Sequence, residues 1–153
     1  MNNKEMIYYV HELHWHLPQE TQQEALDYLI ENAPLNELGQ LFTLSSKAHW
    51  QNCMKVVVAI GYPYNIAAFP KMVELFQDMN WPGANEAVDY FKTLDKQFVV
   101  PFIEAGGKQA IKENDDQWLW FLYTVCERLC MERADFNDGA IFDEMVRIYE
   151  RDE

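Results

Sequence analysis

Basic residues are scarce in this sequence. Only 12 lysines and arginines stand against 25 aspartates and glutamates among 153 residues, and the formal net charge is −13. A protein that gains its affinity by neutralising phosphates needs a basic face. Because the few basic residues are scattered, the sequence argues against binding to nucleic acid or to an anionic membrane. The same acidity favours solubility and would speed association with a basic partner.

Long apolar runs, glycine, proline and cysteine are also scarce. No 18 consecutive residues are apolar, and the first residues lack a basic region followed by an apolar run. We therefore expect neither a transmembrane helix nor a signal peptide. Six glycines and six prolines argue against long disordered stretches. The odd count of three cysteines, Cys53, Cys126 and Cys130, predicts reduced thiols in a cytoplasmic protein.

Apolar residues are abundant, at 49% of the sequence, and they recur at helical spacing. Val99-Val100 alone would suit a strand, but Pro101 and the lack of a partner strand favour a helix entered near Pro101 and loosened at Gly106-Gly107. No linker or composition break divides the sequence, so we expect one all-α domain over residues 1–153. The other helices are predicted over residues 4–16, 19–32, 72–79, 84–91 and 141–151, with a short one through Leu38 and Leu41. A further helix is capped by Ser45 or Ser46 and stopped by Gly61. Another runs through Trp118 and Leu129 and is capped at residues 114–116.

A corner at residues 78–84 organises the middle of the sequence. Asn80 is placed to cap the helix that follows, and Pro82 suits its first turn. The pattern Asp78-x-x-Trp81 returns 37 residues later as Asp115-x-x-Trp118, again before an apolar helix. Such a recurrence predicts stacked antiparallel helical hairpins, in which each pair buries its apolar face against its neighbours.

The same region carries a family resemblance. The run from Leu75 to Ala84, followed by Val99-Val100-Pro101-Phe102-Ile103 and Asp115-Asp116-Gln117-Trp118, resembles a bacterial domain-of-unknown-function family over residues 70–128. The resemblance implies a short HEAT-like array, and such arrays commonly serve as protein-binding surfaces. It brings no catalytic residue, and it does not extend to residues 1–65.

Histidines and cysteines are the first candidates for chemistry. His11 and His14 lie three apart on a predicted helix, where one metal ion would reach both, but no third ligand follows at a characteristic spacing and His16 is expected to point away. We interpret them as partly exposed residues beside the core. Cys126 and Cys130, four apart on a predicted helical face, are interpreted as buried structural thiols. No metal or other cofactor is predicted.

The corner residues are interpreted as structural. Asp78, Asp115 and Asp116 each stand where a helix needs a cap or a turn needs an Asx bond. Trp81 and Trp118 are expected to anchor hairpins in the core. Gly106-Gly107 lacks the lysine, serine and strand context of a phosphate loop, and no Ser-His-Asp, Cys-His or nucleophile-elbow pattern is present. Catalysis is therefore not predicted.

The surface provides the leading functional hypothesis. Glu20, Glu24, Asp27 and Glu31 fall on one line of the helix predicted over residues 19–32, and residues 1–46 hold seven acids against Lys4 alone. We expect a non-enzymatic interaction module whose acidic helix meets a basic protein, such as an immunity or regulatory protein acting on a basic toxin. Three alternatives stay open: a solvated helix face without a partner, a structural homo-oligomer, and an enzyme or metal-binding protein with a pocket near His11 and His14.

Overall fold

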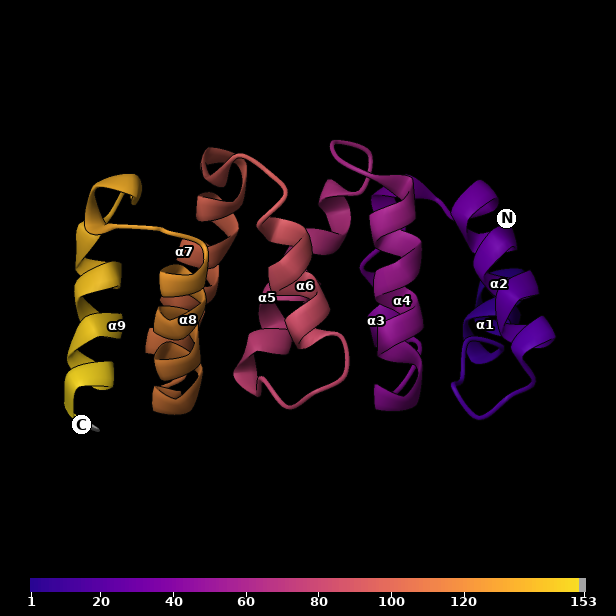
Figure 1. Cartoon of the computed structure of the whole chain (residues 1–153), viewed down its shortest axis with the longest axis horizontal. Coiled ribbons are helices and arrows are strands. Elements are labelled where there is room, and N and C mark those ends of the chain that lie inside the picture. The colour runs from indigo at the N-terminus through magenta and orange to yellow at the C-terminus, as the bar shows by residue number, and fades with distance from the viewer. Residues whose placement is uncertain (152–153) are drawn as a thin grey trace. The chain divides into compact units, whose positions relative to one another are not determined.

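The computed structural model describes residues 1–151, and every regular element in that range is helical (Figure 1). The predicted all-α class is confirmed. None of the described helices is long and apolar enough to cross a membrane. The α-helices are α1 (Asn3–His11), α2 (Gln19–Asn32), α3 (Gln40–Thr43), α4 (Lys47–Ile60), α5 (Phe69–Glu74), α6 (Ala84–Phe91), α7 (Lys96–Lys112), α8 (Asp116–Arg128) and α9 (Gly139–Arg151). Short 3₁₀ segments lie at Leu35–Glu37, Ile66–Ala68, Leu75–Gln77 and Arg133–Asp135.

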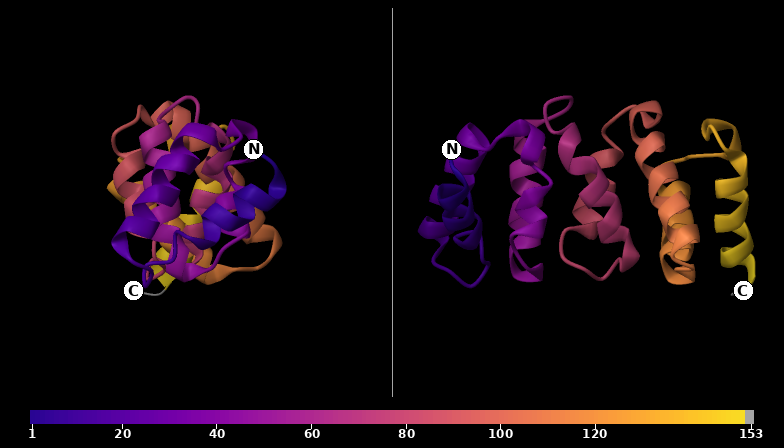
Figure 2. Two further views of the ribbon diagram at one scale, coloured as in Figure 1. Left: turned by 90° about the vertical axis from the view of Figure 1, so that its right-hand side faces the viewer. Right: turned by 180° about the vertical axis from the view of Figure 1, so that it is seen from behind.

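The chain divides into two compact units, Met1–Lys71 and Met72–Glu153. In the first unit, α2 packs against both α1 and α4. In the second, α8 packs against both α7 and α9, and α7 also packs against α9; α8 lies in front of α7 in Figure 1 and behind it in the back view of Figure 2. The prediction of one domain over residues 1–153 stays a prediction.

The first helix is shorter than predicted. It ends at His11 rather than His16, because the next turns tighten: the Leu13 and His14 amides bond the carbonyls three residues back. The Trp15 amide then donates to the Ala48 carbonyl on α4, at 3.1 Å. This contact draws the chain off the helix axis, so the interpretation of His11 and His14 as neighbours on one helix is wrong.

The fourth helix begins as predicted. Ser46 is its N-cap, and Ser46 and His49 satisfy each other's backbone amides in a capping box. Gly61, with φ of 80°, is the C-cap. On this helix Cys53, Met54 and Val57 are buried in the core, whereas Val58 is 43% exposed.

The corner at residues 78–84 differs from its prediction. Asn80 does not cap the following helix; its amide donates to Asp78 Oδ1 at 2.9 Å, which forms an Asx turn. The N-cap of α6 is Gly83, whose φ of 92° suits glycine, and Pro82 lies before the helix. At the second corner the Asp115 side chain does cap α8, because it accepts from the Trp118 amide at 3.0 Å. The two corners therefore share a sequence pattern but not a local structure.

The seventh helix is longer than predicted and unbroken. It starts at Lys96, where the Asp95 side chain caps it by accepting from the Gln97 amide at 3.1 Å, and it continues through Pro101 and both glycines. The predicted start near Pro101 and the loosening at Gly106-Gly107 are wrong. Gly106 and Gly107 are buried and let neighbouring side chains approach the helix backbone closely.

Of the predictions for the tryptophans and the cysteines, some are confirmed and others are wrong. The apolar face of α8 is buried as expected, with Trp118 only 3% exposed, but Trp81 is half-buried rather than in the core. Asp116 is exposed and pairs with Arg151 at 3.1 Å. Cys126 is buried, whereas Cys130 is exposed and lies beyond the end of α8. The interpretation of both cysteines as buried thiols on one helical face is therefore wrong for Cys130.

Candidate functional site: an acidic row beside a tyrosine face

Four carboxylates form a continuous row along α2. The residues of this acidic row are all exposed, and their spacing of three and four residues places them along one side of the helix. Like charges at such spacing repel by a few tenths of a kcal/mol per pair, so the arrangement carries a small cost in stability. The acidic row consists of Glu20, Glu24, Asp27 and Glu31.

Aromatic side chains join α1 to the acidic row. The rings of Tyr9 and Tyr28 stack with centroids 3.9 Å apart, and the ring of Tyr8 meets Tyr9 edge-on at 5.0 Å. These three residues are named here the tyrosine face. Tyr28 lies on α2 four residues after Glu24 and three before Glu31, which makes it a neighbour of both on the helix surface. The tyrosine face and the acidic row are therefore adjacent.

The tyrosine face is partly open to solvent. Tyr8 is 59% exposed and the adjacent Ile7 is 40% exposed. The Tyr28 hydroxyl donates to Glu5 Oε2 at 3.1 Å, and this bond to a carboxylate raises the pKa of Tyr28, so the phenol stays protonated. Exposed aromatic and apolar surface therefore lies next to aligned carboxylates.

A buried polar network holds α2 in place, and the sequence did not reveal it. The Gln22 side chain donates to the carbonyls of Trp15 and Leu17, at 3.0 and 2.7 Å. Asn52 on α4 donates to the Leu13 carbonyl at 2.6 Å and to Gln22 Oε1 at 2.9 Å. Both side chains are more than nine-tenths buried. They satisfy the carbonyls of the loop between α1 and α2, and so fix the start of the helix that carries the acidic row.

One signal for this network was present in the sequence. Asn52 lies three residues after His49 and four before Val56, on the face of α4 that turns inward. A polar residue on an apolar face predicts a satisfied buried hydrogen bond. Its partners come from residues 13 and 22, and nothing in the spacing of the sequence connects them.

All four histidines of the sequence gather at the end of α1. The ring of His14 lies 5.1 Å from that of His49 and 5.4 Å from that of His16, and His11 lies 6.2 Å from His49. The expectation that His16 points away is therefore wrong. Among residues 1–151, no group of three or more His, Cys, Asp or Glu side chains is arranged to hold a metal ion.

The position of His49 predicts a dependence of stability on pH. Burial, and then the proximity of His14 and His11, lower its pKa in the folded state. The unfolded chain therefore binds a proton more readily, with a pKa of about 6.5. The contribution of His49 to the free energy of unfolding is then fully present above about pH 6.5. It declines as the pH falls below this value, by at most about 1.4 kcal/mol per pH unit.

Unfolding in urea between neutral pH and about pH 5.5 measures this effect. His49→Gln keeps a capping box with Ser46, since glutamine at this position also reaches the N-cap amide, but it cannot titrate. We expect the variant to show a flatter dependence on pH than the wild-type protein. Equal slopes in the two proteins would show that His49 does not carry the effect.

The described structure defines an all-α protein with an acidic, tyrosine-flanked face on its first two helices. Comparison of the sequence and the structure with family models, curated proteins and solved structures finds no match. The resemblance of residues 70–128 to a HEAT-like family therefore stays a prediction.

Proposed function

We propose that this protein is a non-enzymatic interaction module that binds a basic protein through the acidic row and the tyrosine face. The observation that carries the proposal is the alignment of four exposed carboxylates beside an aromatic surface that is itself partly exposed. Neither feature alone would point to a partner, since single exposed apolar residues are common on protein surfaces. Their adjacency offers one partner side chain two favourable contacts.

An arginine or lysine from the partner fits this surface best. Its charged group would pair with a carboxylate of the acidic row while its chain or guanidinium plane lies on a tyrosine ring. Complementary charge would also speed the encounter and make it sensitive to salt. An immunity or regulatory protein that blocks a basic toxin or enzyme is a concrete form of this proposal.

The proposed architecture is a short HEAT-like array of stacked antiparallel hairpins. Its support is local: consecutive helices pack together in the pairs α1 and α2, α3 and α4, α7 and α8, and α8 and α9. In such arrays each pair buries its apolar face mainly against its neighbours, and a row of charge on one helix stays available to a partner.

Charge reversal in the acidic row tests the proposed function. We expect the double variant Glu24→Lys with Asp27→Lys to bind a deca-arginine peptide about tenfold more weakly than the wild-type protein at moderate salt, because two favourable pairs become repulsive. Titration calorimetry measures the affinity. Capture from the source cells with both proteins as bait then asks whether the same change removes a basic protein.

A matched control separates the acidic row from the overall charge. Glu113→Lys with Glu127→Lys changes the net charge by the same amount at exposed positions of the second unit. This control should retain nearly full affinity. If both double variants weaken binding equally, the peptide responds to net charge alone and the acidic row is not the site.

A further inference from the structure

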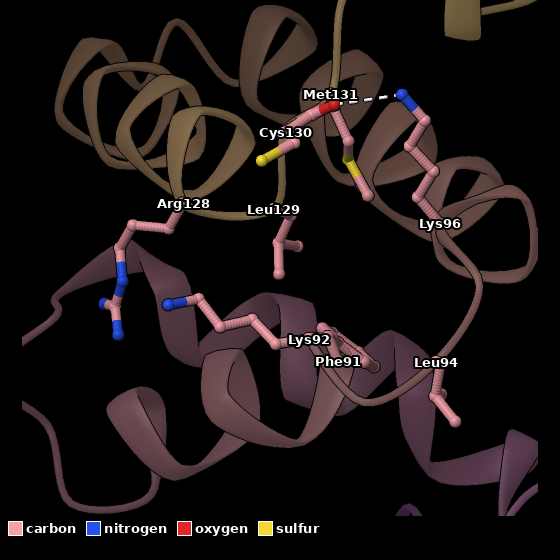
Figure 3. A pocket seen from close by; sticks show the side chains of 8 residues that line it. All are labelled: Phe91, Lys92, Leu94, Lys96, Arg128, Leu129, Cys130 and Met131. Carbon is pink, nitrogen blue, oxygen red and sulfur yellow. Dashed lines mark hydrogen bonds between the residues drawn. The ribbon is translucent and has the colours of Figure 1, made fainter.

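A cavity lined partly by basic residues lies in the second unit. This open cavity of about 300 Å³ is lined by the C-terminal end of α6, the start of α7 and the turn after α8 (Figure 3). Three of the 12 basic residues of the sequence line it, Lys92, Lys96 and Arg128. None of the described residues that line this cavity is acidic.

Acidic neighbours outside the cavity neutralise only part of this charge. Lys96 pairs with Asp135 at 3.0 Å, and Arg128 pairs more loosely with Asp89 at 3.5 Å. Lys92 is exposed and forms no ion pair with any described residue. Figure 3 shows the side chains of Lys92 and Arg128 extending toward the same open space. Of the three basic residues, Lys92 is therefore the one whose charge no described acidic residue pairs with, while Lys96 and Arg128 are each partly neutralised.

Part of the wall of the cavity is apolar. Phe91, Leu129 and Met131 contribute to it, and each is less than a tenth exposed. Lys96 Nζ donates a hydrogen bond to the carbonyl oxygen of Cys130 at 3.0 Å. This carbonyl therefore repels an incoming anion less than a carbonyl without a hydrogen bond would. The thiol of Cys130 is exposed at the same place.

We propose that this cavity binds a small organic anion, in which a phosphate or carboxylate is carried on an apolar body. Lys92 and Arg128 would hold the charged group, since charge-assisted hydrogen bonds from lysine and arginine are the strong ones for such anions. The apolar body would lie against Phe91, Leu129 and Met131. The volume lies at the lower end of the range for ligand pockets, which favours a ligand of one ring or a short chain.

Two measurements with phenyl phosphate, benzoate and phenol test the proposal. The first is affinity, measured by titration calorimetry at low salt. The second is the rate at which iodoacetamide alkylates Cys130, which a ligand in the cavity should slow. Cys53 and Cys126 give little background, because both are buried and burial raises the pKa of each thiol to about 12. We expect both anions to bind and to protect Cys130, and phenol to do neither.

Charge-matched variants complete the test. Lys92→Gln should weaken the affinity for phenyl phosphate about threefold or more, while Lys92→Arg should retain it. Lys108→Gln removes the same charge from an exposed position of α7 outside the cavity and should have no effect. Three results would overturn the proposal: no binding of either anion at millimolar concentration, equal binding of phenol, or equal losses in Lys92→Gln and Lys108→Gln.

Discussion

Replacing Asn52 by alanine is expected to lower the free energy of unfolding by about 2–4 kcal/mol. The change removes two buried hydrogen bonds and leaves the Leu13 carbonyl and Gln22 Oε1 without this donor. An unsatisfied buried acceptor costs about 1–3 kcal/mol. The better helix propensity of alanine offsets about 0.5 kcal/mol of this loss. Unfolding in urea, followed by circular dichroism, measures the difference.

The matched control is Asn32→Ala at the end of α2. Asn32 also donates to a backbone carbonyl, that of Tyr28 at 3.0 Å, but it is exposed and water can replace the bond. This variant should change the free energy of unfolding by no more than about 0.5 kcal/mol. If the two variants lose equal stability, the burial of the hydrogen bonds of Asn52 does not explain their contribution to the free energy of unfolding.

Replacing Gly106 by alanine is expected to destabilise the protein by a net of up to about 2 kcal/mol. An added Cβ would lie 2.5 Å from Cγ1 of Val73 on α5 and 3.6 Å from the ring of Trp118. Val73 is buried and branched at Cβ, so it has little freedom to move away. Overpacking of this kind costs about 1–3 kcal/mol. The gain in helix propensity returns about 1 kcal/mol.

Two further variants distinguish overpacking from other effects. Ala105→Gly, at the adjacent exposed position, measures helix propensity alone. In a Val73→Ala background, Gly106→Ala should cost less than in the wild-type protein by about 1 kcal/mol, because the clashing methyl group is gone. Additive effects of the two substitutions would show that a clash with the Val73 side chain is not what destabilises Gly106→Ala.

The helices were predictable wherever local interactions alone define their ends. Ser46 caps α4 and Asp115 caps α8 as expected, because a cap requires only a side chain and an amide two or three residues away. The predicted start of α7 was wrong because the N-cap at Asp95 outweighs Pro101 and the two glycines. A helix held by its neighbours on both sides tolerates an exposed proline and two buried glycines.

The acidic row was foreseeable for the same reason, since its alignment follows from helical periodicity along one element. The tyrosine face was not, because Tyr9 and Tyr28 are separated by 19 residues and meet only when α1 packs on α2. The gathering of His14, His16 and His49 likewise depends on the early end of α1. The cavity of the second unit depends on Cys130 lying beyond α8 rather than on it.

The sequence by itself determined the all-α class, the net charge, most helix ends and the line of carboxylates on α2. All of these follow from residue spacing of a few positions and from composition. Only the tertiary structure decided which polar groups are buried together, which glycines accept a neighbouring side chain, and where three basic residues surround one cavity. Those features join residues distant in sequence, and their energies come from packing and desolvation, which exist only once the helices have met.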